Sequence, residues 1–479
     1  MTALSGDFAN TRELLEAAAV VYGDREAYVE PGSRISFAEW ASRSRRVAPG
    51  LVARGVGKGD VVALRLPSGI DYATCYAAAA TIGAITTGIN PRLGPREVGA
   101  ILEQTEPALV ISEPAELRRL YDEGGDRFPG VPDVEIDGHD PVALIFSSGT
   151  TGLPKGAVFD GNNLLAGAVS AGVMSAPYDR RLTSTPFAHA GYMFKLWDQL
   201  LWGTTLVIPP TPWSAAGMAT ALHEERITVA GAVPTQWAKL LEVSPAMFPH
   251  LRVGVVATAP ASPELVRAVA DRIGVPLVVR YAMTECPTIC GTEPEDAPDI
   301  QFRTVGRPAP GMAVRLSGDG VVEVRGPCVM RGYWRNPELT AEVLRDGWLR
   351  TGDLGVVHDD GTLSLIGRRD DMYIRGGFNV HPVEVEQVIA THPAVSRAVV
   401  VGCPAPVIGE IGVVFVVPKD ASAPPSLPEL RTHVHTQLAD YKAPDQLIVV
   451  DDIPLTAMFK PDRSALRSLA AANVRGHGT

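Results

Sequence analysis

The sequence predicts an α/β protein in which a large domain with parallel sheets and a β subdomain precedes a smaller α+β domain. Two observations support this prediction. From about residue 60 onward, uninterrupted apolar runs alternate with helix-like segments. Residues 303–366 then shift to shorter β runs punctuated by Gly and Asp, and a charged cluster at 367–371 separates them from the rest of the chain.

The apolar runs are expected to be buried strands at residues 61–66, 108–111, 142–146, 205–208, 251–258 and 277–281. Their apolarity is continuous rather than alternating, which is typical of parallel sheets covered by helices on both faces. Further on, Asp360-Gly361 lies between two β runs and predicts a hairpin turn.

The charged cluster at 367–371 predicts a boundary that gives domains at 1–369 and 370–479. In the second domain, a helix beginning at Pro382 and strands at 395–401 and 413–417 are expected. A second amphipathic helix follows the loop at 421–426. The apolar faces of the two helices consist of Val385, Val388 and Ile389 in the first and Leu430, Val434 and Leu438 in the second.

Composition excludes several classes of protein. The chain of 479 residues is 46% hydrophobic and 20% charged, so it can bury large cores and is not disordered. Its net charge of −11 provides no basic field for nucleic acid or anionic lipid. Residues 72–91 lack charge over a length that could span a bilayer, but they are mostly Ala, Gly and Thr, which favours a buried helix and strand.

The cysteines and the first residues indicate a cytoplasmic protein. The 5 cysteines are scattered, which predicts reduced thiols. Cys286 and Cys290 lie close together, but no second pair of ligands completes a zinc site, so buried neutral thiols are expected. The first residues do not have the pattern of a signal peptide.

A run of hydroxyl-bearing residues and glycines, SSGTTGLPKG, occupies residues 147–156. It follows an apolar run and precedes a helix-like segment at 162–175. Strand, loop and helix in this order can hold a polyphosphate, because backbone N–H groups and hydroxyls donate to phosphoryl oxygens and Lys155 adds positive charge. The spacing around Lys155 excludes a Walker-type loop. The run therefore indicates a nucleotide site of another kind.

This loop resembles the phosphate loop of the adenylate-forming superfamily, which includes acyl-CoA synthetases, stand-alone adenylation domains and beetle luciferases. Further segments match the pattern of that superfamily in order, closest to bacterial fatty-acid-type acyl-CoA ligases. They are YAMTE at 281–285, TGDLG at 351–355, GRRD at 367–370, RGGFNV at 375–380 and PLTAMFK at 454–460. The resemblance implies a ligase that converts a carboxylic acid to acyl-AMP with ATP and Mg²⁺, and then to a thioester with CoA.

The resemblance assigns roles to residues of each segment. It implies a phosphate grip of Ser147, Ser148, Gly149, Thr150, Thr151, Gly152 and Lys155. It implies Tyr281 against adenine, Thr284 at the α-phosphate, Glu285 as the Mg²⁺ ligand, Asp353 and Arg368 at the ribose, and Asp370 as the hinge of a mobile small domain. It implies Gly376 and Gly377 beside the pantetheine arm of CoA, and Lys460 as the catalytic lysine.

The acid itself is only partly indicated. His189 lies where relatives place a residue near the carboxylate entrance, and a purely structural role is equally compatible with the pattern. The surrounding segment lacks the Phe-Asp pairing of relatives that activate amino acids, which favours an uncharged acyl chain or an aryl acid. Candidate pocket residues are Tyr192, Met193, Val233, Pro234, Thr258 and Met283.

Two residues depart from the family pattern. Ala282 replaces a more common Gly and is expected to narrow the acyl pocket slightly. Phe459 replaces the usual Gly before the lysine, and if that position requires φ > 0 the change costs on the order of 1 kcal/mol or more. Adenylation could be slowed, but because Lys460 is retained an active enzyme is expected.

Three alternatives stay open at this point. A stand-alone adenylation enzyme would load the phosphopantetheine of a carrier protein instead of CoA. A weakly catalytic acyl or nucleotide sensor would bind ATP without releasing pyrophosphate in response to an acid. A luciferase-like oxygenase is the least favoured of the three, because oxidation is a substrate-specific addition in this superfamily.

Overall fold

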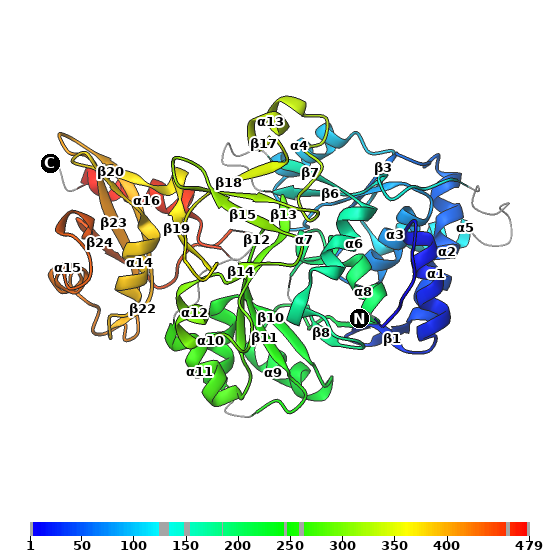
Figure 1. The fold of residues 1–479 in the computed structure, drawn as a ribbon, viewed down its shortest axis with the longest axis horizontal. Coiled ribbons are helices and arrows are strands. Elements are labelled where there is room, and N and C mark those ends of the chain that lie inside the picture. The colour runs from blue at the N-terminus through cyan, green and yellow to red at the C-terminus, as the bar shows by residue number, and fades with distance from the viewer. Residues whose placement is uncertain are drawn as a thin grey trace. The chain divides into compact units, whose positions relative to one another are not determined.

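The computed structural model describes residues 3–123, 134–147, 154–183, 185–243, 247–257, 263–456 and 460–476. These residues divide into two compact units (Figure 1). Unit 1 comprises residues 1–314 and 324–349, and unit 2 comprises residues 315–323 and 350–479. The α/β class predicted from the sequence is confirmed. The predicted domain boundary between residues 369 and 370 and the predicted hinge at Asp370 stay predictions, because a division into compact units does not locate a hinge.

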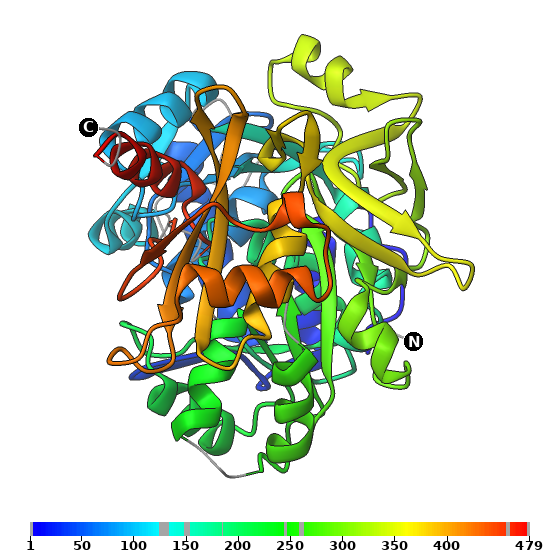
Figure 2. The ribbon, with the colours of Figure 1, turned by 90° about the vertical axis from the view of Figure 1, so that its left-hand side faces the viewer.

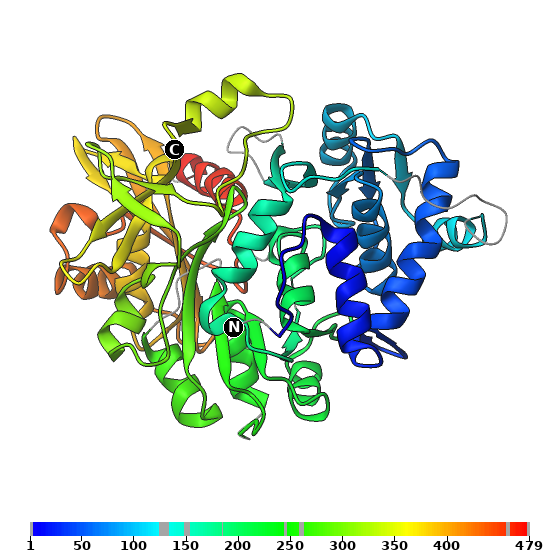
Figure 3. The same ribbon diagram turned by 45° about the vertical axis from the view of Figure 1, so that its right-hand side comes forward.

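One sheet of unit 1 has the strand order β5-β3-β4-β6-β7. The first four strands are parallel to their neighbours, as the continuous apolar runs predicted, whereas β7 is antiparallel to β6. The strands are β3 (Val61–Leu64), β4 (Ile85–Gly88), β5 (Leu109–Ile111), β6 (Pro141–Ser147) and β7 (Lys155–Asp160). The helices near this sheet in sequence are α1 (Thr11–Tyr22), α2 (Phe37–Ala53), α3 (Ile70–Thr81), α4 (Pro95–Thr105) and α5 (Pro114–Glu123), and α1 and α2 lie side by side in Figure 3.

The second sheet of unit 1 has the order β14-β13-β12-β11-β10-β8-β9-β1-β2. Its strands are β1 (Glu26–Glu30), β2 (Ser33–Ser36), β8 (Arg180–Leu182), β9 (Thr205–Val207), β10 (Val229–Ala232), β11 (Val253–Ala257), β12 (Leu277–Met283), β13 (Cys286–Gly291) and β14 (Arg307–Pro308). Helices α9 (Ala215–Glu224), α10 (Pro234–Val243) and α11 (Pro263–Ile273) pack beside β10 and β11 around Trp237, which is fully buried. This core accounts for the apolar runs at 251–258 and 277–281.

The remaining helices of unit 1 are short. They are α6 (Gly161–Val169), α7 (Ala190–Met193), α8 (Leu196–Trp202), α12 (Pro298–Arg303) and α13 (Pro337–Val343), with the 3₁₀ turn η1 (Gly172–Met174). The helix expected at 162–175 therefore ends early, since α6 ends at Val169 with Ser170 as its C-cap and Gly172 then adopts φ +55°. The segment at 72–91 forms α3 and β4, both buried, as expected. Within the described residues, no helix has the length and apolarity needed to span a membrane.

A further sheet has the order β15-β16-β18-β17, with β19 paired to β18. Its strands are β15 (Ala313–Leu316), β16 (Val321–Arg325), β17 (Leu344–Arg345), β18 (Trp348–Val357) and β19 (Leu363–Arg368), and the residues that divide the two units lie within β15, β16 and β18. The predicted Asp360-Gly361 hairpin is confirmed, because β18 and β19 pair in antiparallel register on either side of it.

The rest of unit 2 is a sheet with the order β21-β20-β23-β22 and β24 paired to β23. Its elements are η2 (Arg369–Asp371), β20 (Tyr373–Arg375), β21 (Phe378–Val380), α14 (Pro382–Ala390), β22 (Val395–Ala405), β23 (Gly409–Pro418), α15 (Leu427–His435), η3 (Asp440–Lys442), β24 (Gln446–Val449) and α16 (Arg463–Gly476).

Side chains on successive residues of β22 and β23 point to opposite faces. Val400 and Val414 pack with α14 and α15, whereas Val401 and Phe415 pack with α16. The ribbons of these helices lie beside the strands of the sheet in Figure 2. The predicted helical face of Val385, Val388 and Ile389 is buried, as are Leu430 and Val434, while Leu438 follows the end of α15. The α+β character predicted for this region is confirmed.

Candidate active site

The loop motif lies between two antiparallel strands rather than between a strand and a helix. Ser147, the last residue of β6, is paired with Lys155, the first residue of β7, and α6 begins only at Gly161. The expected order of strand, loop and helix is therefore wrong. The strand that begins at Lys155 runs alongside β6 and needs a small residue at position 156. A Cβ at Gly156 would lie 2.9 Å from Cζ of Phe146, which is too close.

The pairing of Ser147 with Lys155 holds the two ends of the loop together. Ser148, Gly149, Thr150, Thr151 and Gly152 of the predicted phosphate grip lie outside the described residues. The carbonyl of Pro154, just before β7, accepts a hydrogen bond from Gln104 Nε2 at 3.0 Å. The flanks of the loop are thus fixed by backbone pairing and by α4.

Glu285 lies in the turn between β12 and β13, and the residue is only 7% exposed. Its Oε1 accepts hydrogen bonds from Ser147 Oγ at 3.0 Å and from Tyr333 Oη at 2.9 Å. Its backbone carbonyl accepts the Met330 N–H at 2.9 Å. The carboxylate is therefore held at one oxygen by two hydroxyls, and among the described residues none donates a hydrogen bond to Oε2.

Tyr333 was not identified from the sequence. Burial and the neighbouring Glu285 carboxylate raise the pKa of Tyr333, so its hydroxyl remains a donor. Lys155 Nζ lies 5.9 Å from the centre of the Tyr333 ring, so this ring connects the lysine of the loop motif with the carboxylate. Tyr333 is placed here by an isolated antiparallel β-bridge to Ala157 of β7. Because the two residues are far apart in the sequence, this pairing leaves no local sequence pattern.

A single carboxylate fixed in this way suits Mg²⁺, which commonly takes one or two carboxylates and completes its shell with phosphate oxygens and water. Glu285 would hold the ion through the oxygen that the hydroxyls leave available. In the described ranges, no three or more His, Cys, Asp or Glu side chains are grouped so that they could bind a metal on their own. Cys286 and Cys290 are buried free thiols, as expected, and burial raises the pKa of Cys290 to about 12.

Other predicted residues lie on the same strand end as Glu285. Tyr281 is buried on β12 opposite Cys290, Met283 is the last residue of that strand, and Thr284 is half-buried in the turn. The structure therefore brings Tyr281, Met283, Thr284 and Glu285 together at the end of one strand. Their contacts with a nucleotide stay predictions.

His189 precedes the short helix α7, and its backbone N–H donates to the Pro186 carbonyl at 3.1 Å. Its Nε2 lies 3.0 Å from Nδ2 of Asn90, a residue that the sequence reasoning did not identify. Asn90 is 3% exposed and follows β4. The imidazole is thus oriented by a buried amide.

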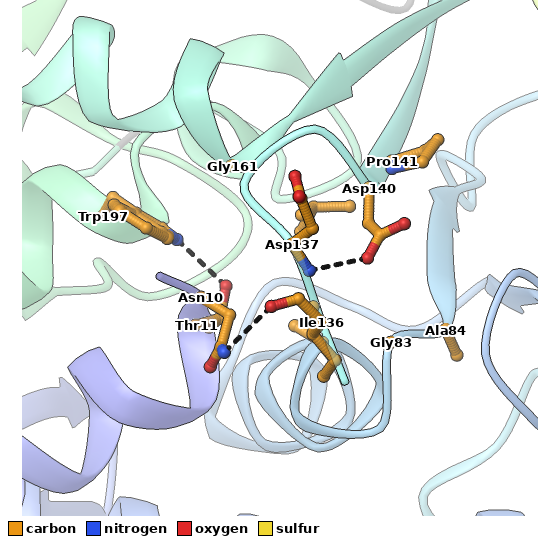
Figure 4. A pocket seen from close by; sticks show the side chains of 12 residues that line it. Asn10, Thr11, Gly83, Ala84, Ile136, Asp137, Asp140, Pro141, Gly161 and Trp197 are labelled. Carbon is orange, nitrogen blue, oxygen red and sulfur yellow. Dashed lines mark hydrogen bonds between the residues drawn. The ribbon is translucent and has the colours of Figure 1, made fainter. Parts of the chain in front are cut away.

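The described members of the predicted pocket lie on several elements of unit 1. Tyr192 and Met193 are buried, and the Tyr192 ring stacks on Phe187 with 3.6 Å between ring centres. Val233 and Pro234 are half-buried where β10 leads into α10, and Thr258 lies outside the described residues. A small hollow between α1 and the segment at 136–141 shares none of these residues (Figure 4). The acyl pocket therefore stays a prediction.

Unit 2 carries the remaining predicted residues. Asp353 and Arg368 are cross-strand neighbours on β18 and β19, and Arg368 Nε donates to Asp353 Oδ1 at 2.9 Å. The Asp353 N–H donates to Thr351 Oγ1 at 3.1 Å, and Thr351 is itself bonded to the Val322 carbonyl. The two residues predicted to meet the ribose are therefore adjacent and mutually oriented.

Gly376 and Gly377 form the turn that joins β20 to β21. Their φ angles are +58° and +87°, the left-handed conformation that a two-residue hairpin turn of this type requires and that glycine adopts at low cost. The Gly376 N–H donates to the Ile408 carbonyl at 2.8 Å, which fixes the turn to the neighbouring hairpin. Asp370, the predicted hinge residue, is exposed in η2.

Lys460 is exposed, and its backbone is hydrogen-bonded to Thr456. The Thr456 N–H donates to the Lys460 carbonyl at 2.8 Å, and Leu455 forms a bridge with Pro461. Phe459 lies outside the described residues, so the effect of replacing the usual glycine stays a prediction. These contacts hold the backbone of Lys460 in place.

Tyr333→Phe tests the hydroxyl clamp on Glu285. Hydrogen bonds to charged groups contribute roughly 1.5–3 kcal/mol, so we expect kcat/KM for ATP to fall about tenfold. We also expect a higher Mg²⁺ concentration at half-maximal activity, because one donor no longer fixes the carboxylate. Initial rates over a Mg²⁺ series measure both effects. Tyr178→Phe, at a 45% exposed tyrosine, is the matched control, and unchanged Mg²⁺ dependence in Tyr333→Phe would contradict the clamp.

Comparison with known proteins agrees with this geometry. Residues 15–334 match the family model described as AMP-binding enzyme, and residues 384–460 match the AMP-binding enzyme C-terminal domain. A feruloyl-CoA synthase of Amycolatopsis sp is 33% identical over 90% of this chain and 92% of the relative. The long-chain-fatty-acid–CoA ligase FadD13 of Mycobacterium tuberculosis is 31% identical over 96% of this chain and 98% of the relative.

Solved structures show the same fold. The crystal structure of ATP-bound MatB from Rhodopseudomonas palustris has a TM-score of 0.85 and 28% identity, covering 96% of this chain and 99% of that one. The first family match includes the loop motif, Glu285 and Tyr333, and the second ends at Lys460. The matched ranges also include the segments at 281–285 and 454–460. The chain therefore belongs to the AMP-binding enzyme family.

Proposed function

We propose that this protein activates a hydrophobic carboxylic acid with ATP, forming acyl-AMP and pyrophosphate, and then transfers the acyl group to the thiol of CoA. The observation that carries this proposal is the Glu285 carboxylate, which accepts hydrogen bonds from Ser147 and Tyr333, with Lys155 Nζ 5.9 Å from the centre of the Tyr333 ring. This arrangement places one oriented anion and one cation at the flanks of a loop rich in hydroxyl-bearing residues and glycine.

In the first half-reaction, a carboxylate oxygen of the acid attacks the α-phosphorus of ATP, and the bond to the pyrophosphate oxygen breaks. The chain contributes positioning and charge rather than a nucleophile of its own. Lys155 and the loop hydroxyls would hold the departing phosphates, Thr284 would donate to the α-phosphate, and Lys460 would bridge it and the acid. Mg²⁺ held by Glu285 would supply positive charge to the phosphate oxygens.

In the second half-reaction, the sulfur of CoA attacks the acyl carbon, the thiol loses its proton and AMP leaves. The turn at Gly376 and Gly377 would lie beside the pantetheine arm, where the absence of side chains permits a close approach. Asp370 is the proposed hinge of the small domain between the half-reactions. The mixed anhydride is prone to hydrolysis, so the site must also exclude water.

The proposed acid is fatty or otherwise hydrophobic, including aryl acids. The candidate pocket residues carry no charge, and Val233, Pro234 and Met283 are apolar and half-buried. The relatives also support this class, since one is named for a phenolic aryl acid and another for long-chain fatty acids. Each of these acids has its carboxylate at the end of an uncharged body.

A pyrophosphate-release screen over fatty, branched, aryl and polycyclic acids, with and without CoA, tests the proposal. We expect release that depends on a hydrophobic acid, and acyl-CoA as the product when CoA is added. ATP binding without acid-dependent release would contradict the ligase function and favour a sensor. Poor acyl-CoA yield that a carrier protein restores would contradict CoA as the acceptor.

A further inference from the structure

Asn90 joins two segments of unit 1 that lie far apart in the sequence. It follows β4, and its side chain meets His189, which lies 99 residues further along the chain. The Asn90 Oδ1 accepts the backbone N–H of Arg92 at 3.0 Å, and its Nδ2 lies 3.0 Å from His189 Nε2. Because Asn90 is 3% exposed, water has little access to replace either contact.

The contact with Arg92 fixes which end of the amide faces the imidazole. A backbone N–H can only donate, so the amide oxygen must point toward Arg92 and the amide nitrogen toward His189. The nitrogen carries donors and no acceptor, so the hydrogen bond to His189 requires a lone pair on Nε2. The neutral ring then carries its proton on Nδ1. A proton on Nε2 would place two donors against each other at 3.0 Å.

The backbone of His189 is anchored independently of this contact. Its N–H donates to the Pro186 carbonyl, and its own carbonyl accepts the N–H groups of Tyr192 at 3.0 Å and Met193 at 2.9 Å. The backbone bonds set where the side chain starts, and Asn90 sets the orientation of the ring. The arrangement has the geometry of a support that selects the tautomer of a histidine.

We propose that Asn90 is a positioning residue that holds His189 as the neutral Nδ1–H tautomer at the carboxylate entrance. This inference rests on the proposed function, in which His189 lies near the acid. A neutral ring can orient the acid but contributes no positive charge. The negative charge of the acid's carboxylate would therefore be balanced by Lys460 and by the Mg²⁺ held by Glu285. Asn90 acts through His189 and not by touching the acid.

Imidazole ¹⁵N NMR of the full-length protein tests the tautomer directly. With ¹⁵N-histidine labelling, the signals come from the 10 histidines, and His189→Gln identifies that of His189 by its loss. At pH 8 we expect Nδ1 to carry the proton and Nε2 to have the shift of an unprotonated nitrogen. A protonated Nε2 in the wild-type protein would overturn the proposal, whether or not the enzyme activates an acid.

Asn90→Asp is the informative variant, because a carboxylate keeps an acceptor for the Arg92 N–H while presenting an acceptor to His189. We expect Nε2 to become protonated in this variant and KM for the acid to rise about tenfold, with kcat changed less. Asn90→Leu removes both contacts without adding a charge, so it controls for the charge of the Asp variant. In Asn90→Leu we also expect His189 no longer to be restricted to the Nδ1–H tautomer. An unchanged His189 spectrum in both variants would overturn the proposal.

A double-variant cycle separates positioning from a general effect on the fold. If Asn90 acts through the imidazole, Asn90→Asp should change KM for the acid little in a His189→Gln background. Full additivity of the two substitutions would overturn the functional half of the proposal. Absence of acid-dependent pyrophosphate release in the wild-type protein would instead contradict the proposed function, while the NMR result would still decide the tautomer.

Discussion

Lys460→Ala is expected to lower acid-dependent pyrophosphate release by about a hundredfold or more, while thioester formation from supplied acyl-adenylate is retained. A charged donor aimed at developing charge in a transition state typically contributes a factor of this size. The substitution should leave the fold intact, because Lys460 is exposed and its backbone is held by hydrogen bonds with Thr456.

The two half-reactions are measured separately, as pyrophosphate release from ATP and acid and as acyl-CoA formation from acyl-adenylate and CoA. Lys419→Ala, at another exposed lysine of unit 2, is the matched control and should affect neither. Equal loss of both half-reactions in Lys460→Ala would contradict a role confined to adenylation.

Gly377→Trp is expected to reduce CoA transfer about a hundredfold while acid-dependent pyrophosphate release persists. A Cβ at Gly377 meets no atom within 4 Å, so the indole would project from the turn rather than into the core of unit 2. There it would fill the space proposed for the pantetheine arm. The φ of +87° adds a backbone cost of roughly 1–2 kcal/mol for a residue with a side chain.

Gly377→Asn is the control for that backbone cost, because Asn tolerates the left-handed conformation and has a small side chain. We expect it to retain most of the transfer activity. If Asn and Trp reduced transfer equally, the strain of the turn and not the bulk of the side chain would be responsible. Normal transfer in Gly377→Trp would contradict the placement of the CoA arm.

Helices and strands whose buried residues recur at a regular spacing within a short stretch of sequence were predictable. The run at 277–281 is β12, and the spacing of Val385, Val388 and Ile389 marks α14, because each pattern records which side of an element faces the core. The Asp360-Gly361 hairpin was also predictable, since its turn residues determine its geometry. The strand β7 was missed because its pairing partner, rather than any helical periodicity, determines its conformation.

The site was predictable only where the resemblance named its residues. Glu285 was identified in this way, but its partners Ser147 and Tyr333 lie 138 and 48 residues away from it, so no spacing rule links them. Asn90 is a similar case, because its contact with His189 depends on how β4 and α7 are placed in the same unit. Contacts between distant segments are a property of the tertiary fold and leave no periodic signal.

The buried cysteine thiols allow partial unfolding of the protein to be measured by chemical labelling. Cys75, Cys286, Cys290 and Cys328 lie in unit 1, whereas Cys403 alone lies in unit 2, and all are at most 2% exposed. A thiol-reactive reagent can therefore modify Cys403 only when the core around β22 opens. Mass spectrometry of protein labelled in increasing urea would show which unit loses its structure first, without introducing any probe.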